Sequence, residues 1–214
     1  MSSRLLLSLV LFSFVACSPG DPAEGAPSDE APAVQPGDSG QRETAVFAGG
    51  CFWSVEANFE AVPGVVTAVS GFAGGATANP SYDRVVRGGT GHLEAVQVTF
   101  DPARISYRQL VDRFWRTIDP TDPDGQFCDQ GSSYATAVFA NPGQKAAAEA
   151  SRRVAAARIG PARFVTPVRD AVRFWPAGAE HQDFARRNPR RYGGYTRFCG
   201  RAARLRAVWG DAAA

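Results

Sequence analysis

The chain is short of the residues from which metal and phosphate sites are built. Its 214 residues include four cysteines, two histidines, one methionine and a single lysine, Lys145. The cysteines and histidines are too irregularly spaced for a structural zinc site, whose ligands come in close pairs. The glycine-rich segments 71–75 and 88–91 lack the lysine and the spacing of a phosphate-binding loop, so we interpret them as turns. These absences argue against both classes of site.

The apolar run at the N-terminus is too short to span a membrane. It covers residues 5–16 and follows one basic residue, Arg4, a pattern that predicts a secretory signal peptide over residues 1–16. Cys17 comes next, and the sequence around it resembles a bacterial lipoprotein processing site. We therefore expect lipid attachment to Cys17, a membrane anchor, and export to the bacterial cell envelope facing the periplasm. A soluble periplasmic product is the alternative.

Residues 17–42 have many prolines and no aromatic residue, so they cannot bury enough apolar surface to fold. We predict a disordered tether with a reach of roughly 25 Å. Residues 43–214 are enough for one domain with a sizeable core, and nothing in them indicates an obligate assembly, so we expect a monomer.

The folded part is moderately basic. Residues 43–214 contain 21 basic and 16 acidic side chains, and the densest basic cluster lies between Arg186 and Arg191. No nucleic-acid recognition motif accompanies this cluster. We interpret it as a solvated face and expect no nucleic-acid partner.

A cysteine stands at the junction between a predicted strand and a predicted helix. Residues 45–48 are apolar, Gly49 and Gly50 permit a sharp turn, and apolar residues then recur at helical spacing over 52–62. Cys51 should therefore lie in an exposed turn at a helix N-terminus, where the helix dipole lowers the pKa of a thiol. A buried core cysteine is the alternative.

A carboxyl group lies on the buried side of another predicted strand, residues 92–100. Val96, Val98 and Phe100 alternate as in a strand with one buried face, and Glu94 shares that face. Burial raises the pKa of a carboxyl group, which suits it to act as a general acid. A surface glutamate is the alternative.

The rest of the pattern predicts strands at 65–72 and up to Phe139, a strand region at 164–175, and helices at 106–118, 142–158 and 180–184. A short helix should also follow Asn79 and Pro80. The order of these elements predicts an α+β sandwich, with helices packed on one mixed sheet.

Four motifs together resemble the A-type peptide-methionine sulfoxide reductases. They are Gly50–Trp53, Gly91–Val96, Asp129–Tyr134 and His181–Phe184, within a resemblance that covers residues 43–210. The resemblance implies a ferredoxin-like fold and reduction of the S epimer of methionine sulfoxide, free or in oxidised proteins. It implies a thioredoxin-like reductant and no metal or organic cofactor.

The resemblance also assigns roles to the polar residues of these motifs. Cys51 would attack the sulfoxide sulfur, and Glu94 would supply a proton to the oxygen. Tyr82 and Tyr134 would donate hydrogen bonds to that oxygen as it gains charge, and Asp129 would support the local polar network.

Aromatic residues beside Cys51 would form the substrate side of the site. Phe52 and Trp53 are expected to line an apolar slot for the methyl group next to the sulfoxide sulfur. Ser54, where the family usually has glycine, and Ala135, where arginine is common, depart from the pattern, so substrate contacts should differ there.

The product of the first step would be a sulfenic acid on Cys51, which a second thiol can convert to a disulfide. By resemblance Cys199 is the resolving cysteine, and Cys128 is the alternative. Many relatives place another cysteine where this chain has Gly193, so a two-cysteine relay is not predicted.

Three other functions are compatible with parts of the sequence. A cysteine hydrolase or acyltransferase would use His92 or His181 as the base for Cys51. A metal-binding envelope protein would use the cysteines and histidines together. A purely structural lipoprotein would not depend on Cys51.

Overall fold

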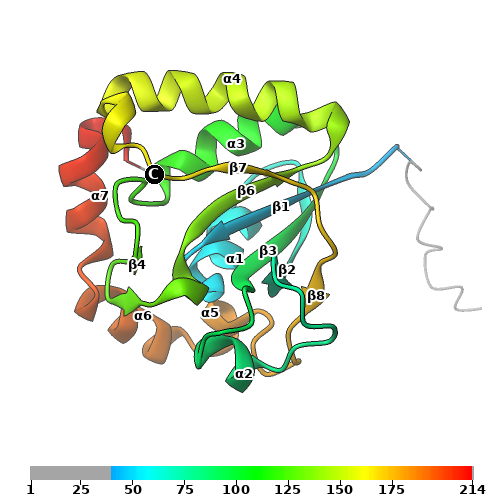
Figure 1. Ribbon diagram of the computed structural model, residues 1–214, viewed down its shortest axis with the longest axis vertical. Helices are drawn as coiled ribbons and strands as arrows, with labels where there is room; N and C mark the ends of the chain where they lie inside the picture. The colour runs from blue at the N-terminus through cyan, green and yellow to red at the C-terminus, as the bar shows by residue number, and fades with distance from the viewer. Residues whose placement is uncertain (1–39, 214) are drawn as a thin grey trace, which may run out of the picture. The chain divides into compact units, whose positions relative to one another are not determined.

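The computed structural model describes residues 40–213 of the chain (Figure 1). The predicted signal peptide 1–16, the predicted lipid site Cys17 and the tether up to residue 39 lie outside the described residues. Within residues 40–213, no helix is both long enough and apolar enough to cross a membrane.

Six strands form one mixed sheet with the order β7-β6-β1-β3-β2-β8. These strands are β1 (Glu43–Gly49), β2 (Val65–Ala73), β3 (Leu93–Phe100), β6 (Thr136–Ala140), β7 (Val168–Asp170) and β8 (Trp175–Pro176). Neighbouring strands are antiparallel except β6 and β7, which are parallel. A separate small hairpin pairs β4 (Gly125–Gln126) with β5 (Asp129–Gln130).

Three of the helices pack over the sheet. Their bounds are α1 (Phe52–Glu60), α2 (Tyr82–Val86), α3 (Tyr107–Arg116), α4 (Pro142–Ile159), α5 (Phe184–Arg187), α6 (Pro189–Phe198) and α7 (Arg201–Trp209). Figure 1 shows α3 and α4 running together along the top of the view, with α6 and α7 following one another at the side. Short 3-10 helices lie at Ser132–Tyr134, Pro161–Arg163 and Gly210–Ala212.

The main core lies between the sheet and helices α1, α3 and α4. On β1, Phe47 faces this core, whereas its neighbours Val46 and Ala48 face a smaller cluster on the other side of the sheet. The alternation follows from the two-residue period of a strand. On α3, Phe114 packs against Phe47 with ring centroids 5.0 Å apart.

Capping explains where the two longest helices of this layer begin. Ser106 and Asn141 each accept a hydrogen bond from the backbone N–H three residues later. In each case the side-chain oxygen of the glutamine at that later position accepts a hydrogen bond from the backbone N–H of the capping residue. This is the capping box that the sequence predicts at Ser106.

The predicted α+β class is confirmed. Four central strands in the order β6-β1-β3-β2, joined through α1 and α3, give the strand-helix-strand-strand-helix-strand sequence of a ferredoxin-like sandwich. β7 and β8 extend this unit at its two edges.

Two predicted elements are wrong in their extent. The strand region 164–175 is divided, because only β7 and β8 pair, and they do so at opposite edges of the sheet. The helix expected at 180–184 is instead a turn, and α5 begins at Phe184 after Asp183 adopts a left-handed conformation with φ of 53°.

The predicted elements also do not include α6 and α7. Gly193 and Gly194 lie inside α6, where each weakens a helix by about 1 kcal/mol relative to alanine. The helix forms nonetheless, begins at Pro189, and carries side chains to the region described next.

Candidate active site

Cys51 lies between β1 and α1, as the strand-to-helix pattern predicts. Gly50 has a φ of 78°, and a Cβ at this position would clash with the side chain of Gln126. Only glycine meets both conditions without strain. The turn therefore brings Cys51 to the N-cap of α1, directly before Phe52.

The predicted environment of Cys51 is wrong in one respect. The side chain is buried, with 6% of its surface exposed, so the turn is not an exposed one. Burial and, to a smaller extent, the nearby charge of Glu94 raise the pKa of Cys51 to about 12. A backbone hydrogen bond from Trp53 at the start of α1 acts in the predicted direction, but burial outweighs it. Cys51 is therefore a thiol at neutral pH.

Glu94 is buried on β3, which excludes the alternative of a surface glutamate. Only 1% of its surface is exposed, and its Oε2 accepts a hydrogen bond from the backbone N–H of Phe52 at 2.9 Å. Burial raises the pKa of Glu94 to about 8, and the charge of Asp129 contributes in the same direction. The carboxyl group is therefore mainly protonated at neutral pH and can act as a proton donor.

Two phenols from different elements face the same centre. Tyr82 begins α2, and Tyr134 ends the 3-10 helix that follows β5. Tyr134 lies near enough to Tyr82 to lower its pKa, and the charges of Glu94 and Cys51 act to raise the pKa of both phenols. Burial raises the pKa of Tyr82 to about 12 and that of Tyr134 in the same direction, so both hydroxyls keep their protons.

Asp129 has a partner that the sequence did not reveal. The hydroxyl of Tyr195, on α6, donates a hydrogen bond to Oδ2 of Asp129 and also lies beside the side chain of Cys51, whose pKa it acts to lower. Burial raises the pKa of Asp129, while Tyr195 and the charge of Arg201 act to lower it. The only available signal was the four-residue spacing from Tyr195 to Cys199, which is informative only once α6 is known.

Aromatic rings surround the first turn of α1. Phe52 is fully buried among Phe72, Tyr82 and His181, with ring centroids 5.2 to 6.1 Å apart. Trp53 is half-buried and stacks on Phe184 at 3.7 Å. Phe52 thus belongs to the core as well as to the rim of the centre, and the methyl slot lined by Phe52 and Trp53 stays a prediction.

The departure at Ser54 has a structural counterpart. Ser54 is fully buried, and the hydroxyl of Tyr192 on α6 donates a hydrogen bond to its Oγ at 3.4 Å. The serine therefore helps to hold α6 against α1, where a glycine would offer no side-chain partner.

The two candidate resolving cysteines are joined to each other. Cys128 and Cys199 form a disulfide with their Cα atoms 4.9 Å apart, and Cys51 remains free. Cys128 is exposed on the loop of the small hairpin, directly before Asp129, and Cys199 follows Tyr195 by one helical turn. Ligand-type atoms of Cys128, Asp129 and Cys199 lie within 4.8 Å of one another, but two sulfurs bonded to each other are not thiolate ligands.

The two histidines proposed as bases for a hydrolase lie in different surroundings. The Nδ1 atom of His92 accepts a hydrogen bond from the N–H of Gly75 at 3.2 Å, and its Nε2 donates to the carbonyl of Thr77 at 2.7 Å. His181 is buried among aromatic rings, with its centroid 4.3 Å from that of Tyr82, and burial lowers its pKa. His92 thus braces a glycine-rich loop, and His181 contributes to an aromatic wall.

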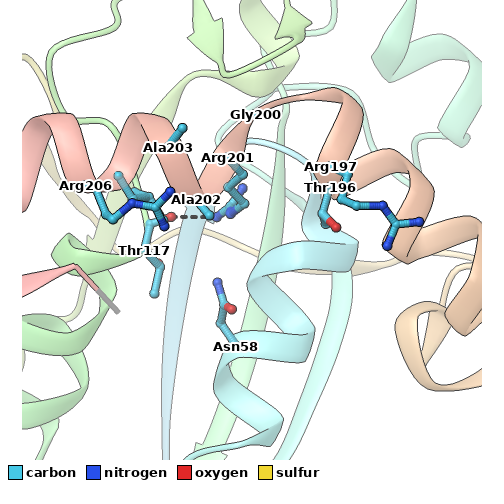
Figure 2. A pocket seen from close by; sticks show the side chains of 10 residues that line it. Asn58, Thr117, Thr196, Arg197, Gly200, Arg201, Ala202, Ala203 and Arg206 are labelled. Atoms are coloured by element: carbon cyan, nitrogen blue, oxygen red, sulfur yellow. Dashed lines mark hydrogen bonds between the residues drawn. The ribbon is translucent and has the colours of Figure 1, made fainter.

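A cavity of about 440 Å³ lies between α1 and the segment that joins α6 to α7. Figure 2 shows Asn58 and Thr117 facing residues of these helices, and Arg201 donating a hydrogen bond to the carbonyl of Thr117 at 2.5 Å. The Arg201 guanidinium also lies over the ring of Phe127, 4.3 Å from its centroid. None of the predicted catalytic residues lines this cavity. Arg201 instead anchors the turn after Cys199 beside the loop that carries Cys128.

Comparisons with known proteins agree with this geometry. Residues 43–213 match the family model described as peptide methionine sulfoxide reductase. The chain is 50% identical over 179 residues to the peptide methionine sulfoxide reductase MsrA 2 of Rhizobium meliloti (strain 1021), which covers 83% of this chain and 89% of the relative. It is 49% identical over 168 residues to the protein of the same name from Caulobacter vibrioides, covering 78% and 86%.

A solved structure shows the same architecture. Methionine sulfoxide reductase A of Corynebacterium diphtheriae superposes with a TM-score of 0.64 and 33% sequence identity, over 72% of this chain and 77% of that one.

Proposed function

The chain belongs to the peptide methionine sulfoxide reductase family, and from this premise we propose that it reduces the S epimer of methionine sulfoxide, in proteins and as the free amino acid. The observation that carries the proposal is the pair formed by Cys51 and Glu94. The free thiol of Cys51 lies at the start of α1. The protonated carboxyl group of Glu94 accepts a hydrogen bond from the backbone N–H of Phe52, the next residue.

The pair supplies what a sulfoxide requires. The sulfur of Cys51 attacks the substrate sulfur, and Glu94 donates a proton to the sulfoxide oxygen, which is otherwise a poor leaving group. Tyr82 and Tyr134 keep their protons and donate hydrogen bonds to the oxygen as its charge develops. The oxygen ends on Cys51 as a sulfenic acid, and the substrate leaves as the thioether. Cys51 is oxidised by two electrons, and the substrate sulfur is reduced by two.

The disulfide supports a route for recycling Cys51. The thiol of Cys199 attacks the sulfur of the sulfenic acid, which forms a Cys51–Cys199 disulfide and releases water. The thiolate of Cys128 then attacks Cys199, which frees Cys51 as a thiol and leaves the Cys128–Cys199 pair of the structure. In this route Cys199 resolves first, as the resemblance implies, and Cys128 takes over the disulfide.

A thioredoxin-like dithiol would complete the cycle at this second disulfide. Cys128 is exposed, whereas Cys51 is buried, so a protein reductant reaches the former more easily than the latter. The relay thus carries oxidising equivalents from a closed site to the surface.

We also propose that the enzyme acts in the cell envelope as a lipoprotein anchored through Cys17. The sequence before Cys17 supports this localisation. Labelling of wild type and Cys17→Ser with radioactive palmitate tests it, because only the wild type should incorporate the label. Equal labelling of the two proteins, or labelling of neither, would refute lipid attachment to Cys17.

Turnover of the separate S and R epimers tests the activity itself. Wild type should reduce only the S epimer, and Cys51→Ser should be inactive with any reductant. Cys199→Ser and Cys128→Ser should both retain activity with dithiothreitol and lose it with thioredoxin. A wild type that reduces neither epimer would refute the activity. Thioredoxin-supported turnover by either single variant would refute the relay.

A further inference from the structure

Tyr195 connects the nucleophile to a carboxylate. Its hydroxyl donates a hydrogen bond to Asp129 and lies beside the side chain of Cys51. These three residues come from the start of α1, from β5 and from α6, so the contact exists only in the folded chain.

The hydrogen bonds in this chain of groups have one consistent direction. A phenol has a single proton, and Tyr195 donates it to Asp129, an acceptor when ionised. The phenol oxygen of Tyr195 is then the atom that can accept the proton of the Cys51 thiol. The path is therefore S–H to oxygen, then O–H to carboxylate.

We propose that Tyr195 is a catalytic residue of the sulfoxide reduction, on whose assignment this inference rests, and that it passes the proton of Cys51 to Asp129. As the Cys51 sulfur forms its bond to the substrate sulfur, its S–H bond breaks and the proton moves to the Tyr195 oxygen. The phenol proton moves to Asp129 at the same time. Tyr195 ends unchanged, Asp129 ends protonated, and no electrons leave the sulfur centres.

The surrounding charges keep the acid and the base distinct. Glu94, from β3, is protonated and therefore donates to the sulfoxide oxygen, while Tyr82 and Tyr134 remain neutral donors. Asp129 is the other carboxyl group that faces Cys51; burial raises its pKa, and the hydrogen bond from Tyr195 and the positive charge of Arg201 from α7 oppose that rise and favour its ionised form. One proton is thus delivered to the oxygen while another is taken from the sulfur.

Cys51 needs such a base because its burial holds it as a thiol at neutral pH. The helix N-terminus alone does not remove the proton. Both nitrogens of His92 are already engaged by backbone groups, and none of the described hydrogen bonds joins His181 to Cys51.

The test is a single turnover by the full chain, prepared with the Cys128–Cys199 disulfide formed and Cys51 reduced. The rate of methionine formation from the S epimer is measured between pH 6 and 10 for wild type, Tyr195→Phe and Asp129→Asn. We expect a loss of about 10²-fold for each variant at pH 7, because a positioned base contributes at least that much. The rate of each variant relative to wild type should then rise with pH, as hydroxide replaces the missing base, and the affinity for substrate should not change.

Tyr107→Phe is the matched control. It removes a buried phenol hydroxyl that has no hydrogen-bond partner among the described residues, so its rate and pH profile should equal those of wild type. The double variant Tyr195→Phe, Asp129→Asn should be no slower than either single variant, because two members of one relay lose the same step. Wild-type rates for Tyr195→Phe, an unchanged pH profile, or losses that multiply in the double variant would each overturn the relay.

Alkylation of Cys51 by iodoacetamide, followed on its peptide by mass spectrometry, needs no sulfoxide. It should be several-fold slower in Tyr195→Phe at pH 8, because the attacking thiol loses the acceptor that takes its proton. If wild type does not reduce the S epimer but alkylation is slowed in Tyr195→Phe, the proposed reductase activity is refuted and the proton path is retained. Normal turnover with unchanged alkylation would refute the path. If Tyr195→Phe does not fold, Asp129→Asn carries the same pH test without changing α6.

Discussion

Replacing Glu94 by glutamine should separate the stability of the protein from its activity. The carboxyl group is almost fully buried and is held by one backbone N–H. Glutamine has nearly the same shape, and its carbonyl oxygen can accept the same hydrogen bond. It cannot ionise, so the substitution removes the titration while retaining most of the packing.

The size of the effect follows from the two pKa values. Glu94 titrates near 4.5 in the unfolded chain and near 8 in the native state, a difference worth about 5 kcal/mol at 1.36 kcal/mol for each unit. The native state binds the extra proton between these values, so the contribution of Glu94 to stability is present below pH 4.5 and is lost as the pH rises toward 8.

Chemical denaturation at pH 5 and pH 9 measures this difference. Relative to wild type, Glu94→Gln should gain about 4 to 5 kcal/mol in unfolding free energy between the two pH values. Glu56 is also buried, with its pKa raised to about 7, but it is present in both proteins and cancels. Glu43→Gln, at an exposed position on β1, serves as the control and should show no such gain.

Activity should move in the opposite direction. Glu94→Gln should lose about 10² to 10⁴ in the rate of sulfoxide reduction, because the amide holds no proton that it can transfer. The wild-type rate should fall about tenfold per pH unit above about 8, as the acid form of Glu94 is lost. Equal pH dependence of stability in the two proteins would refute the reasoning, and so would full activity of the variant.

Three further predictions concern the frame of the site. Gly50→Ala should lower the free energy of unfolding by about 2 kcal/mol more than Gly88→Ala, as measured by urea denaturation. Both glycines have positive φ, but only a Cβ at Gly50 would clash with a neighbour. Tyr82→Phe should lower kcat/KM for the S epimer by about 10²-fold, as expected for the loss of one donor to a developing charge, with its thermal midpoint unchanged. Reducing the Cys128–Cys199 disulfide, which closes a separation of 71 residues, should cost about 4 kcal/mol in denaturation experiments, and Cys128→Ser should match the reduced protein.

The parts of the fold that the sequence predicts well are those with a local cause. The apolar run before Gly49, the capping box at Ser106 and the alternation around Val96 each depend on neighbouring residues, and each element lies where it was expected. Segments with tertiary causes were missed. The strand region 164–175 is divided by pairing at two distant edges, and α6 forms despite Gly193 and Gly194.

The candidate site divides in the same way. The position of Cys51 at the N-cap of α1 and the burial of Glu94 follow from pattern alone. The pKa of Cys51 does not, because it depends on how closely β3, β5 and α6 pack around the thiol. The contact of Tyr195 with Asp129 joins residues 66 positions apart, which no local pattern specifies.

The burial that opposes the thiolate is the same burial that makes Glu94 an acid. Burial disfavours a charge on sulfur and on carboxyl alike, and two negative charges so close together would repel each other. The pocket therefore holds both groups neutral until a sulfoxide arrives, and the proton given to its oxygen then accompanies the formation of the sulfur–sulfur bond. A site with an exposed thiolate would be a stronger nucleophile at rest but would also react with alkylating agents and peroxides. Burial of Cys51 thus favours reaction with a substrate that can accept a proton in the same step.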